Sequence, residues 1–197
     1  EKEEKEDCTL IYNGFNFDNF SYYKPIEHKN KYKVTMLYHT MELKGAKYGI
    51  EALNTVKKAI PQLTANMFGT PQKPIALPEW ITYHQLPDKE TLNKIYNEGA
   101  IFIGCSNIEG WGLPIGEAMI CGAAVACTDN KGYLEMAKDG ETALVSPIKD
   151  SKALAENIIR LINDDELRYR IATNGNRFIQ RFTWDESYAK LKQTLGI

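Results

Sequence analysis

Short, continuously apolar segments alternate along the chain with longer segments in which apolar residues recur every three or four positions. The short segments predict strands at residues 34–38, 63–68, 81–83, 100–104, 123–127 and 142–145. Strands that are apolar on both faces and separated by helices are typical of a parallel sheet that helices cover on both sides. The pattern therefore predicts an α/β fold with a doubly wound parallel sheet.

The longer, amphipathic segments predict helices. Between the strands, helices are expected within the segments 45–60, 88–96 and 114–122. Beyond Asp150 the pattern becomes helical throughout, with apolar stripes at 154–162, 167–179 and 184–195. Thr183 stands where it can cap the last of these helices. The sheet is thus expected to be followed by C-terminal helices.

Composition places the chain among single-domain globular proteins. Of its 197 residues, 43% are hydrophobic and 25% are charged, and the formal net charge of −2 gives no general attraction to nucleic acid or acidic lipid. No apolar run approaches the ~20 residues that a membrane-spanning helix needs. The 4 cysteines form no C-x-x-C pair, which indicates reduced, buried thiols of a cytosolic protein and no zinc site.

The chain starts with Glu1 in place of methionine, and every residue from 1 to 7 is charged. Such a run has no apolar side chain to bury, so residues 1–7 are expected to form a solvated tail or linker. The start indicates a fragment of a longer protein that is cut within a polar linker.

The segment Gly104–Met119 carries the most informative chemistry. It places two carboxylates, Glu109 and Glu117, in order: the first in a glycine-punctuated loop and the second just inside a helix. Gly110 and Gly112 allow positive φ and close backbone approach, and a helix start offers free N–H groups. The segment therefore suits an anionic or polyhydroxylated ligand.

The position of this segment in the predicted fold supports a ligand site. In doubly wound sheets, ligands bind at the carboxyl ends of the strands, where this loop and the loop at residues 39–45 are expected to lie. The motifs G-x-x-x-x-G-K-[ST] and G-x-G-x-x-G after a strand are both missing from the sequence. Their absence disfavours a P-loop NTPase and a typical dinucleotide dehydrogenase.

The same segment resembles the E-x7-E element of the family-4 retaining glycosyltransferases, usually written E-G-[FW]-G-L-P-x-x-E-A-M-x-C-G. Here the element reads Glu109-Gly110-Trp111-Gly112-Leu113-Pro114, then Glu117-Ala118-Met119 and Cys121-Gly122. Further similarities to the family are Asn13-Gly14 with Phe20, Lys44-Gly45, Gly132 with Glu135, Asp139-Gly140 and Phe182-Thr183-Trp184.

The resemblance runs from about residue 8 to the end of the chain. It covers only the carboxyl-terminal, nucleotide-sugar-binding half of the two-domain GT-B fold, which is Rossmann-like. It implies that residues 8–182 form this half, and that residues 183–197 form a helix packed on it or on the missing amino-terminal half.

The resemblance also implies roles for individual residues. Lys44, beside Gly45, would contact the diphosphate of a nucleotide-sugar donor, and Glu117 would bind the ribose hydroxyls. Glu109 would lie near the transferred sugar, and we expect Glu109 and Lys44 to be catalytic. A lysine charge at a helix start makes a metal ion unnecessary, so neither a metal nor another cofactor is expected.

The remaining donor-binding residues implied by the family surround these three. Backbone N–H groups of the loop would face the sugar or phosphate, and the base would stack near residues 83–85. The residues concerned are Gly110, Trp111, Gly112, Leu113, Pro114, Tyr83 and Gln85. Ordinary alternatives stay open, because a tryptophan often packs in a core or its rim, and Gly132 and Glu135 equally fit a turn and a helix start.

One departure from the family concerns the diphosphate. The family usually has arginine five residues before its lysine, and this chain has Tyr38-His39 at the two places of its G-R. Histidine cannot form the bidentate fork that arginine offers a phosphate. Either His39 or Lys47 replaces the arginine with weaker binding, or the diphosphate sits differently. A histidine that ends a strand and bonds locally is the ordinary alternative.

Together these features imply the donor-binding domain of a retaining, metal-independent glycosyltransferase that moves a sugar from a nucleotide-diphosphate sugar to a glycan, lipid or protein acceptor. The acceptor site would lie in the missing half, so the fragment is expected to bind nucleotide and catalyse little. Two alternatives remain: another GT-B enzyme, such as a sugar-nucleotide epimerase or a phosphorylase, and a module that only binds. A cytoplasmic location is expected, with any peripheral contact with a membrane made through the missing half.

Overall fold

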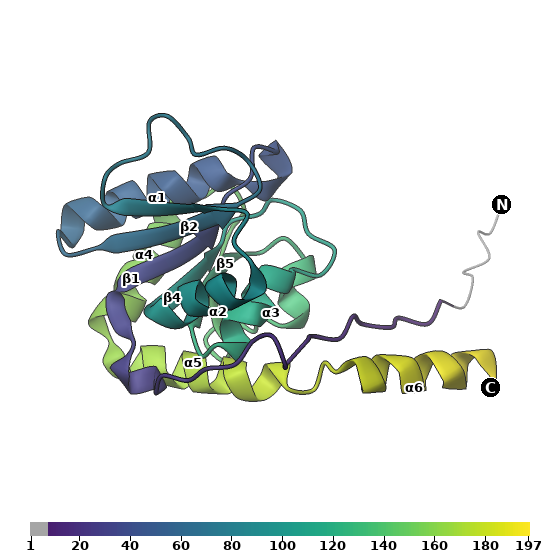
Figure 1. Ribbon diagram of the computed structural model, residues 1–197. Helices are drawn as coiled ribbons and strands as arrows, with labels where there is room; N and C mark the ends of the chain where they lie inside the picture. Colours follow the sequence, from purple (N-terminus) through teal and green to yellow (C-terminus); the bar gives the residue numbers. More distant parts are fainter. Residues whose placement is uncertain (1–7) are drawn as a thin grey trace.

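A computed structural model describes residues 8–197, so the tail expected at residues 1–7 lies outside the described residues. Six strands form one sheet in the order β3-β2-β1-β4-β5-β6 (Figure 1), and every neighbouring pair is parallel. The strands are β1 Asn30–Leu37, β2 Thr64–Gly69, β3 Ile81–Gln85, β4 Gly99–Gly104, β5 Ala124–Thr128 and β6 Ala143–Ser146. The predicted parallel sheet is confirmed.

Helices cover both faces of the sheet (Figure 1). On one face, α1 (Ala46–Ala59) and α4 (Ser151–Asn163) pack against an apolar layer of the sheet. On the other face lie α2 (Lys89–Glu98) and α3 (Leu113–Ile120) over a second apolar layer, to which the end of α5 (Asp165–Ile179) also contributes. The sheet is therefore doubly wound, as the sequence pattern predicts.

The direction of winding changes between two neighbouring strands. The chain leaves β1 toward α1 on one face, and it leaves β4 toward α3 on the opposite face. Because β1 and β4 are hydrogen-bonded neighbours, the two connecting loops begin side by side and diverge. Such a switch point is where open α/β sheets bind ligands.

Helix starts differ between this switch point and the rest of the molecule. Four helices begin at a side chain that accepts a hydrogen bond from the backbone N–H three residues later; these caps are Asp88, Asp150, Asp164 and Thr183. By contrast, α1 and α3 begin at Gly45 and Gly112, both left-handed, with φ of 61° and 93° and no side-chain cap. Among the α-helices, α1 and α3 at the switch point are therefore the two whose first N–H groups no capping side chain satisfies.

Differences from the sequence predictions are local. Strand β1 begins at Asn30, before the predicted residue 34. Its polar first residues belong to the sheet because Asn30 pairs with Gly99 of β4 and Lys33 pairs with Thr64 of β2. Cys105, Cys121 and Cys127 are buried as expected, but Cys8 is exposed. The expectation of a buried thiol is wrong at Cys8 because this residue belongs to the extended amino-terminal segment and not to a strand.

The amino-terminal segment and helix α6 (Trp184–Leu195) extend together away from the sheet (Figure 1). Ser187 Oγ donates to Tyr12 O at 2.6 Å, and Phe15 N donates to Phe182 O at 2.9 Å. No residue of α6 is buried. The helix predicted over residues 184–195 is confirmed, whereas its packing on another half of the protein stays a prediction.

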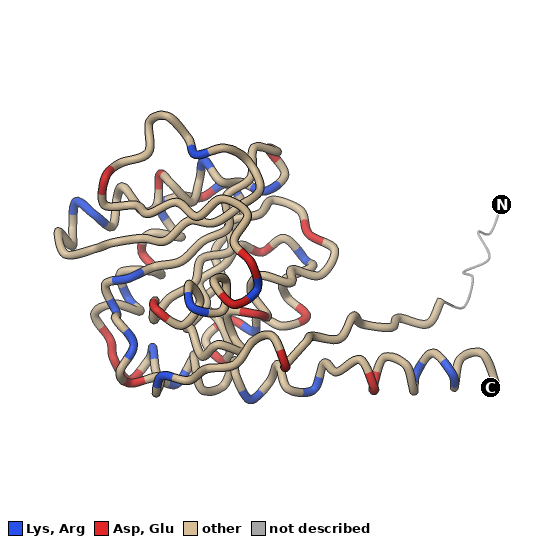
Figure 2. Tube along the Cα trace, viewed as in Figure 1, with Lys and Arg blue, Asp and Glu red and all other residues tan. Residues whose placement is uncertain are grey.

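Charged residues of both signs are interspersed along the trace (Figure 2), in keeping with the small net charge. None of the helices in residues 8–197 combines the length and the apolar character that crossing a membrane requires.

Candidate functional site

The loops after β1 and β4 are joined by backbone contacts. Asn107 N donates to Leu43 O at 2.7 Å, and Asn107 Nδ2 donates to Glu42 O at 2.9 Å. A β carbon on Gly45 would overlap the carbonyl oxygen of Cys105, so only glycine allows this approach. The end of the short 3-10 helix η2 (Glu42–Lys44) is thereby held against the start of the E-x7-E loop.

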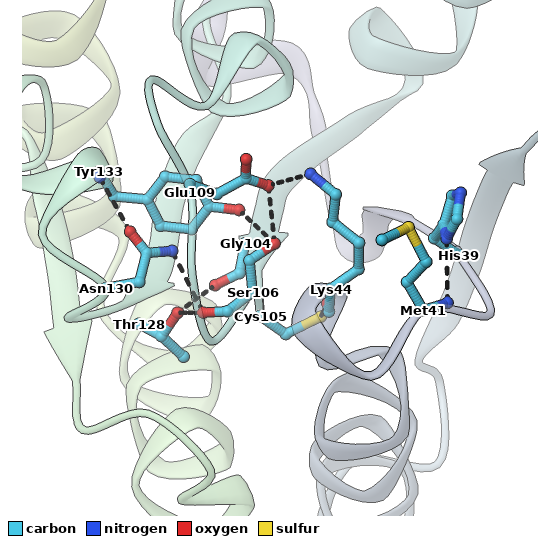
Figure 3. Close-up of polar contacts among 10 residues, drawn as sticks. All are labelled: His39, Met41, Lys44, Gly104, Cys105, Ser106, Glu109, Thr128, Asn130 and Tyr133. Atoms are coloured by element: carbon cyan, nitrogen blue, oxygen red, sulfur yellow. Dashed lines mark hydrogen bonds and ion pairs between the residues drawn. The ribbon is translucent and has the colours of Figure 1, made fainter.

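This arrangement brings Lys44 and Glu109 into contact (Figure 3). Lys44 Nζ lies 2.7 Å from Glu109 Oε1, although the two residues are 65 positions apart in sequence. The Glu109 side chain is 11% exposed and that of Lys44 is 29% exposed. A cation and a carboxylate thus stand at the switch point, mostly shielded from solvent, where their electrostatic effect on a ligand is larger than at an open surface.

Glu109 is also held by a hydroxyl chain that the sequence reasoning did not identify (Figure 3). Ser106 Oγ donates to Glu109 Oε1 at 2.9 Å, and the Tyr133 hydroxyl donates to Ser106 Oγ at 3.1 Å. Ser106 and Tyr133 are both 3% exposed, and burial raises the pKa of the Tyr133 hydroxyl. A serine after a strand and a tyrosine in a turn carry no spacing signal that would have predicted this chain.

The backbone at Ser106, which carries this chain of hydroxyl groups, is held by residues at the end of β5 and in the turn that follows it. Asn130 Nδ2 and Thr128 Oγ1 both donate to Ser106 O, and Tyr133 N donates to Asn130 Oδ1 at 3.0 Å. A β carbon on Gly132 would overlap Glu109 O, which explains the glycine there as a close-approach residue. The turn in η3 (Gly132–Glu135) therefore supports the Glu109 loop directly.

Glu117 occupies a separate place on α3. The Tyr96 hydroxyl of α2 donates to Glu117 Oε2 at 2.7 Å. Burial raises the pKa of Glu117, while the hydrogen bond from Tyr96 acts in the opposite direction. Among residues 8–197, no hydrogen bond or ion pair links Glu117 to Lys44 or Glu109. The acidic pair of the motif is thus divided, with Glu109 turned to Lys44 and Glu117 to Tyr96.

His39 and Lys47, the two candidates for the missing arginine, both have local partners. His39 Nδ1 accepts a hydrogen bond from Met41 N at 3.0 Å, which leaves Nε2 as the nitrogen that can face a ligand (Figure 3). Lys47 is exposed; its Nζ lies 3.5 Å from Glu42 Oε1 and 4.9 Å from the centre of the Tyr48 ring. Neither side chain reproduces a planar, bidentate donor.

The two glycines of the E-x7-E loop have different surroundings, and Trp111 between them packs against aromatic side chains. A β carbon on Gly112 would overlap the Tyr133 ring, whereas Gly110 has open space around it. The Trp111 ring stacks on Tyr12 with centroids 4.9 Å apart, and it meets Phe182 edge-on at 5.0 Å. Its indole therefore fits the packing alternative, while contact of the loop backbone with a ligand stays a prediction.

Leu113 and Pro114 open α3, directly after the left-handed Gly112. Proline at this position removes an N–H that has no partner within the helix, and its fixed φ suits the first turn. The helix start is thus well defined at the mouth of the loop.

Tyr83 and Gln85 lie at the end of β3, next to the β1 loop. Tyr83 packs edge-on against Tyr38 with centroids 5.8 Å apart, and its hydroxyl donates to Pro71 O. Gln85 Nε2 donates to Thr70 O at 3.5 Å. The side chain of His84 alternates to the opposite face, where burial lowers its pKa. Tyr83 and Gln85 therefore share one face of β3, on which Tyr83 meets Tyr38.

A cavity of about 420 Å³ opens beside the E-x7-E loop. It lies between residues 10–13 and the side chains and backbone of Gly110, Trp111, Lys131, Gly132 and Glu135. No group of three or more His, Cys, Asp or Glu side chains within the described part of the chain is gathered closely enough to hold a metal ion.

The fold matches solved glycosyltransferase structures. The C-terminal domain of a glycosyl transferase group 1 family protein (LpcC) from Francisella tularensis superposes with a TM-score of 0.74 at 24% identity, covering 87% of this chain and 100% of that one. Anabaena Alr3699/HepE, solved in complex with UDP and glucose, gives a TM-score of 0.81 at 21% identity, covering 95% of this chain and 56% of that one. The domain thus has the fold of one half of a GT-B protein.

Curated relatives are similar over part of the chain. The O-antigen chain mannosyltransferase B of Escherichia coli is 32% identical over 106 residues, which are 54% of this chain and 27% of the relative. The capsular polysaccharide biosynthesis glycosyltransferase CapM of Staphylococcus aureus is 34% identical over 96 residues, 46% of this chain and 25% of the relative. The matched segments thus span about a quarter of the length of these relatives. A family model described as glycosyl transferases group 1 matches residues 21–178, and the chain therefore belongs to the group 1 glycosyltransferases.

Proposed function

We propose that this chain is the donor-binding domain of a retaining, metal-independent glycosyltransferase that transfers a sugar from a nucleotide-diphosphate sugar to a glycan, lipid or protein acceptor. The observation that carries the proposal is the contact of Lys44 with Glu109 at the switch point of the sheet, between two helix starts without side-chain caps. The Anabaena neighbour, which was solved with UDP and glucose, supports a donor of this class.

In this proposal Lys44 binds the diphosphate. The leaving diphosphate gains negative charge as the bond to the sugar breaks, and a preorganised cation stabilises that charge without rearrangement. When a diphosphate enters, the Lys44 ammonium exchanges part of its contact with Glu109 for the phosphate oxygens. At the start of α3, which no side chain caps, the Leu113 N–H adds a donor for the same anion.

Glu109 then interacts with the transferred sugar. Its position is fixed by Ser106, so its carboxylate remains in place when Lys44 turns to the phosphate. A fixed carboxylate can accept hydrogen bonds from sugar hydroxyls and stabilise positive charge that develops at the reacting carbon. Glu117 binds the ribose hydroxyls, and Tyr83 with Gln85 lies near the base. In this proposal the acceptor site, and the other half of the active-site cleft, are formed by a part of the protein outside this chain.

The test is a calorimetric titration of the chain with UDP, GDP and ADP sugars in the presence of EDTA. One class of nucleotide should bind without metal, and Lys44→Met should weaken binding about 10- to 100-fold, the usual worth of a charged hydrogen bond. Glu117→Ala should remove most of the affinity. Lys94→Met is the matched control, because Lys94 pairs with Glu90 on the exposed side of α2. Equal affinities for the parent and Lys44→Met would refute the assignment of Lys44.

One observation favours a second candidate, a domain that binds nucleotide sugars and has lost transfer. His39 stands where the family has arginine, and its Nδ1 is occupied by Met41 N, so only one ring nitrogen can meet a phosphate. Turnover by the full-length protein with any sugar nucleotide would exclude this candidate. Its expected signature is donor binding without turnover for any donor and acceptor.

A further inference from the structure

Tyr96 is the one residue of α2 whose side chain reaches a predicted ligand-binding group. It is 1% exposed, and its hydroxyl donates to Glu117 Oε2 at 2.7 Å. A buried hydroxyl without a partner costs about 1–3 kcal/mol. The hydrogen bond to Glu117 avoids this cost for Tyr96, whereas a phenylalanine at the same position would need no such partner. The bond links two helices that the E-x7-E motif does not connect.

The position of the Tyr96 ring is determined by its aromatic neighbours. Phe20, Phe68 and Phe102 surround it, with ring centroids 5.8, 5.4 and 5.7 Å from its own. The ring meets Phe20 and Phe68 nearly edge-on, at 78° and 77°. A ring enclosed on several sides cannot swing, so the hydroxyl stays where Glu117 meets it.

The end of α2 is anchored as well. Lys29 is 5% exposed, and its Nζ donates to Tyr96 O at 3.5 Å and to Asn97 O at 3.1 Å. Asn97 Nδ2 donates to Ser21 O at 2.9 Å. A lysine at a helix end stabilises the carbonyl groups there, so the backbone that carries Tyr96 is fixed on both sides.

The bond leaves Glu117 able to bind a diol. Each carboxylate oxygen has about two acceptor positions, so Oε2 can accept from Tyr96 and from one ligand hydroxyl together. No residue between 8 and 197 donates a hydrogen bond to Oε1. One hydrogen bond thus orients the carboxylate while both oxygens keep room for a pair of adjacent hydroxyls.

We propose that Tyr96 is a positioning residue that orients the Glu117 carboxylate for the ribose diol of the donor, and that donor affinity depends on the Tyr96 hydroxyl through Glu117 alone. This inference rests on the proposed function. It adds a residue from outside the E-x7-E motif to the donor site.

The titratable groups around Glu117 allow a specific readout. Tyr96 of α2 donates to it directly; Cys121, which directly follows α3, is buried, and burial raises the pKa of its thiol to about 12. Further out, the charge of Lys29 lowers the pKa of Cys121, and Tyr133 raises the pKa of Tyr96. Of the groups around Glu117, Tyr96 is the one whose hydrogen bond lowers the pKa of this carboxyl and so favours its ionised form.

The first experiment needs no nucleotide. Carbon-13 NMR of labelled glutamate carboxyl groups should show the pKa of Glu117 higher in Tyr96→Phe than in the parent, because the ionised form loses its donor. Tyr169→Phe is the matched control, since it removes a hydroxyl that bonds Glu27 O on the exposed surface. An unchanged pKa of Glu117 in a folded Tyr96→Phe variant overturns the proposal.

The second experiment measures nucleotide affinity in a double-mutant cycle. Tyr96→Phe should weaken binding of the ribonucleoside diphosphate about 10-fold, and should change nothing in a Glu117→Ala background. It should also leave binding of the 2′,3′-dideoxy analogue unaltered. Equal losses in both backgrounds would show a general structural role and overturn the proposal. If the parent binds no nucleotide while the pKa of Glu117 shifts as expected, the proposed function fails, and with it the role of this pair in donor binding.

Discussion

Gly45 lies directly against the carbonyl group of Cys105, so close that no β carbon fits between them. The contact joins the loop after β1 to the loop after β4, backbone to backbone. Lys44 immediately precedes Gly45, and Ser106 immediately follows Cys105. The close approach that Gly45 allows therefore sets the distance between Lys44 and Ser106, whose hydroxyl group holds Glu109.

Gly45→Ala should separate the two loops. We expect a loss of about 3 kcal/mol in the free energy of unfolding, because the substitution combines a left-handed φ with an overlap against backbone. Nucleotide affinity should fall with it, since Lys44 moves from Glu109. Chemical denaturation and calorimetry measure the two effects.

Gly140→Ala is the control for this substitution. Gly140 has a φ of 72° but open space around its Cα, so alanine there should cost only the ~1–2 kcal/mol of a left-handed residue. The two variants separate strain in the backbone from the close approach. Equal losses would show that the contact with Cys105 has no energetic consequence.

The hydroxyl chain behind Glu109 should show non-additive energetics. Ser106→Ala leaves the buried Tyr133 hydroxyl without its acceptor, which should cost about 2 kcal/mol of stability. Adding Tyr133→Phe removes the orphaned hydroxyl, so the double variant should recover about 1 kcal/mol of that loss. Thermal and denaturant unfolding of the single and double variants give the comparison.

Ser146 provides the matched control for Ser106. It is equally buried at 3% exposure, and its hydroxyl donates to Cys127 O. Tyr133→Phe added to Ser146→Ala should recover nothing, because the two side chains do not share a hydrogen bond. Recovery in this background as well would mean that phenylalanine stabilises position 133 for an unrelated reason.

Lys29 should give stability a rising pH dependence at alkaline pH. Burial lowers its pKa from 10.5 to about 8 in the folded chain. Between these values the unfolded chain binds more protons than the folded one, so the free energy of unfolding rises with pH, by at most about 3 kcal/mol. Below pH 8 both states carry the charge and the contribution is flat.

Lys29→Met should remove this rise, as measured by denaturant unfolding at several pH values. Lys152→Met is the control, since Lys152 is exposed on α4 and should leave the rise intact. If the curves of the parent and Lys29→Met remain parallel from pH 8 to 10.5, Lys29 is not the group responsible.

The sequence by itself determined the class of the fold and the type of its elements. Apolar runs and helical periods report which faces are buried, and residues such as Asp88 and Thr183 mark helix starts through bonds to the backbone three residues away. The E-x7-E motif is equally local, so it identified the family and pointed to Glu109, Glu117 and their glycines.

Only the tertiary structure decided which partners these residues have. The order of the strands places β1 beside β4, so Lys44 meets Glu109 across 65 positions, and helix packing brings Tyr96 to Glu117 across 21 positions. It also turned Trp111 toward Tyr12 and placed Tyr133 behind Ser106. A pattern of neighbours along the chain cannot specify such pairs, because each depends on how two separate elements are placed in space.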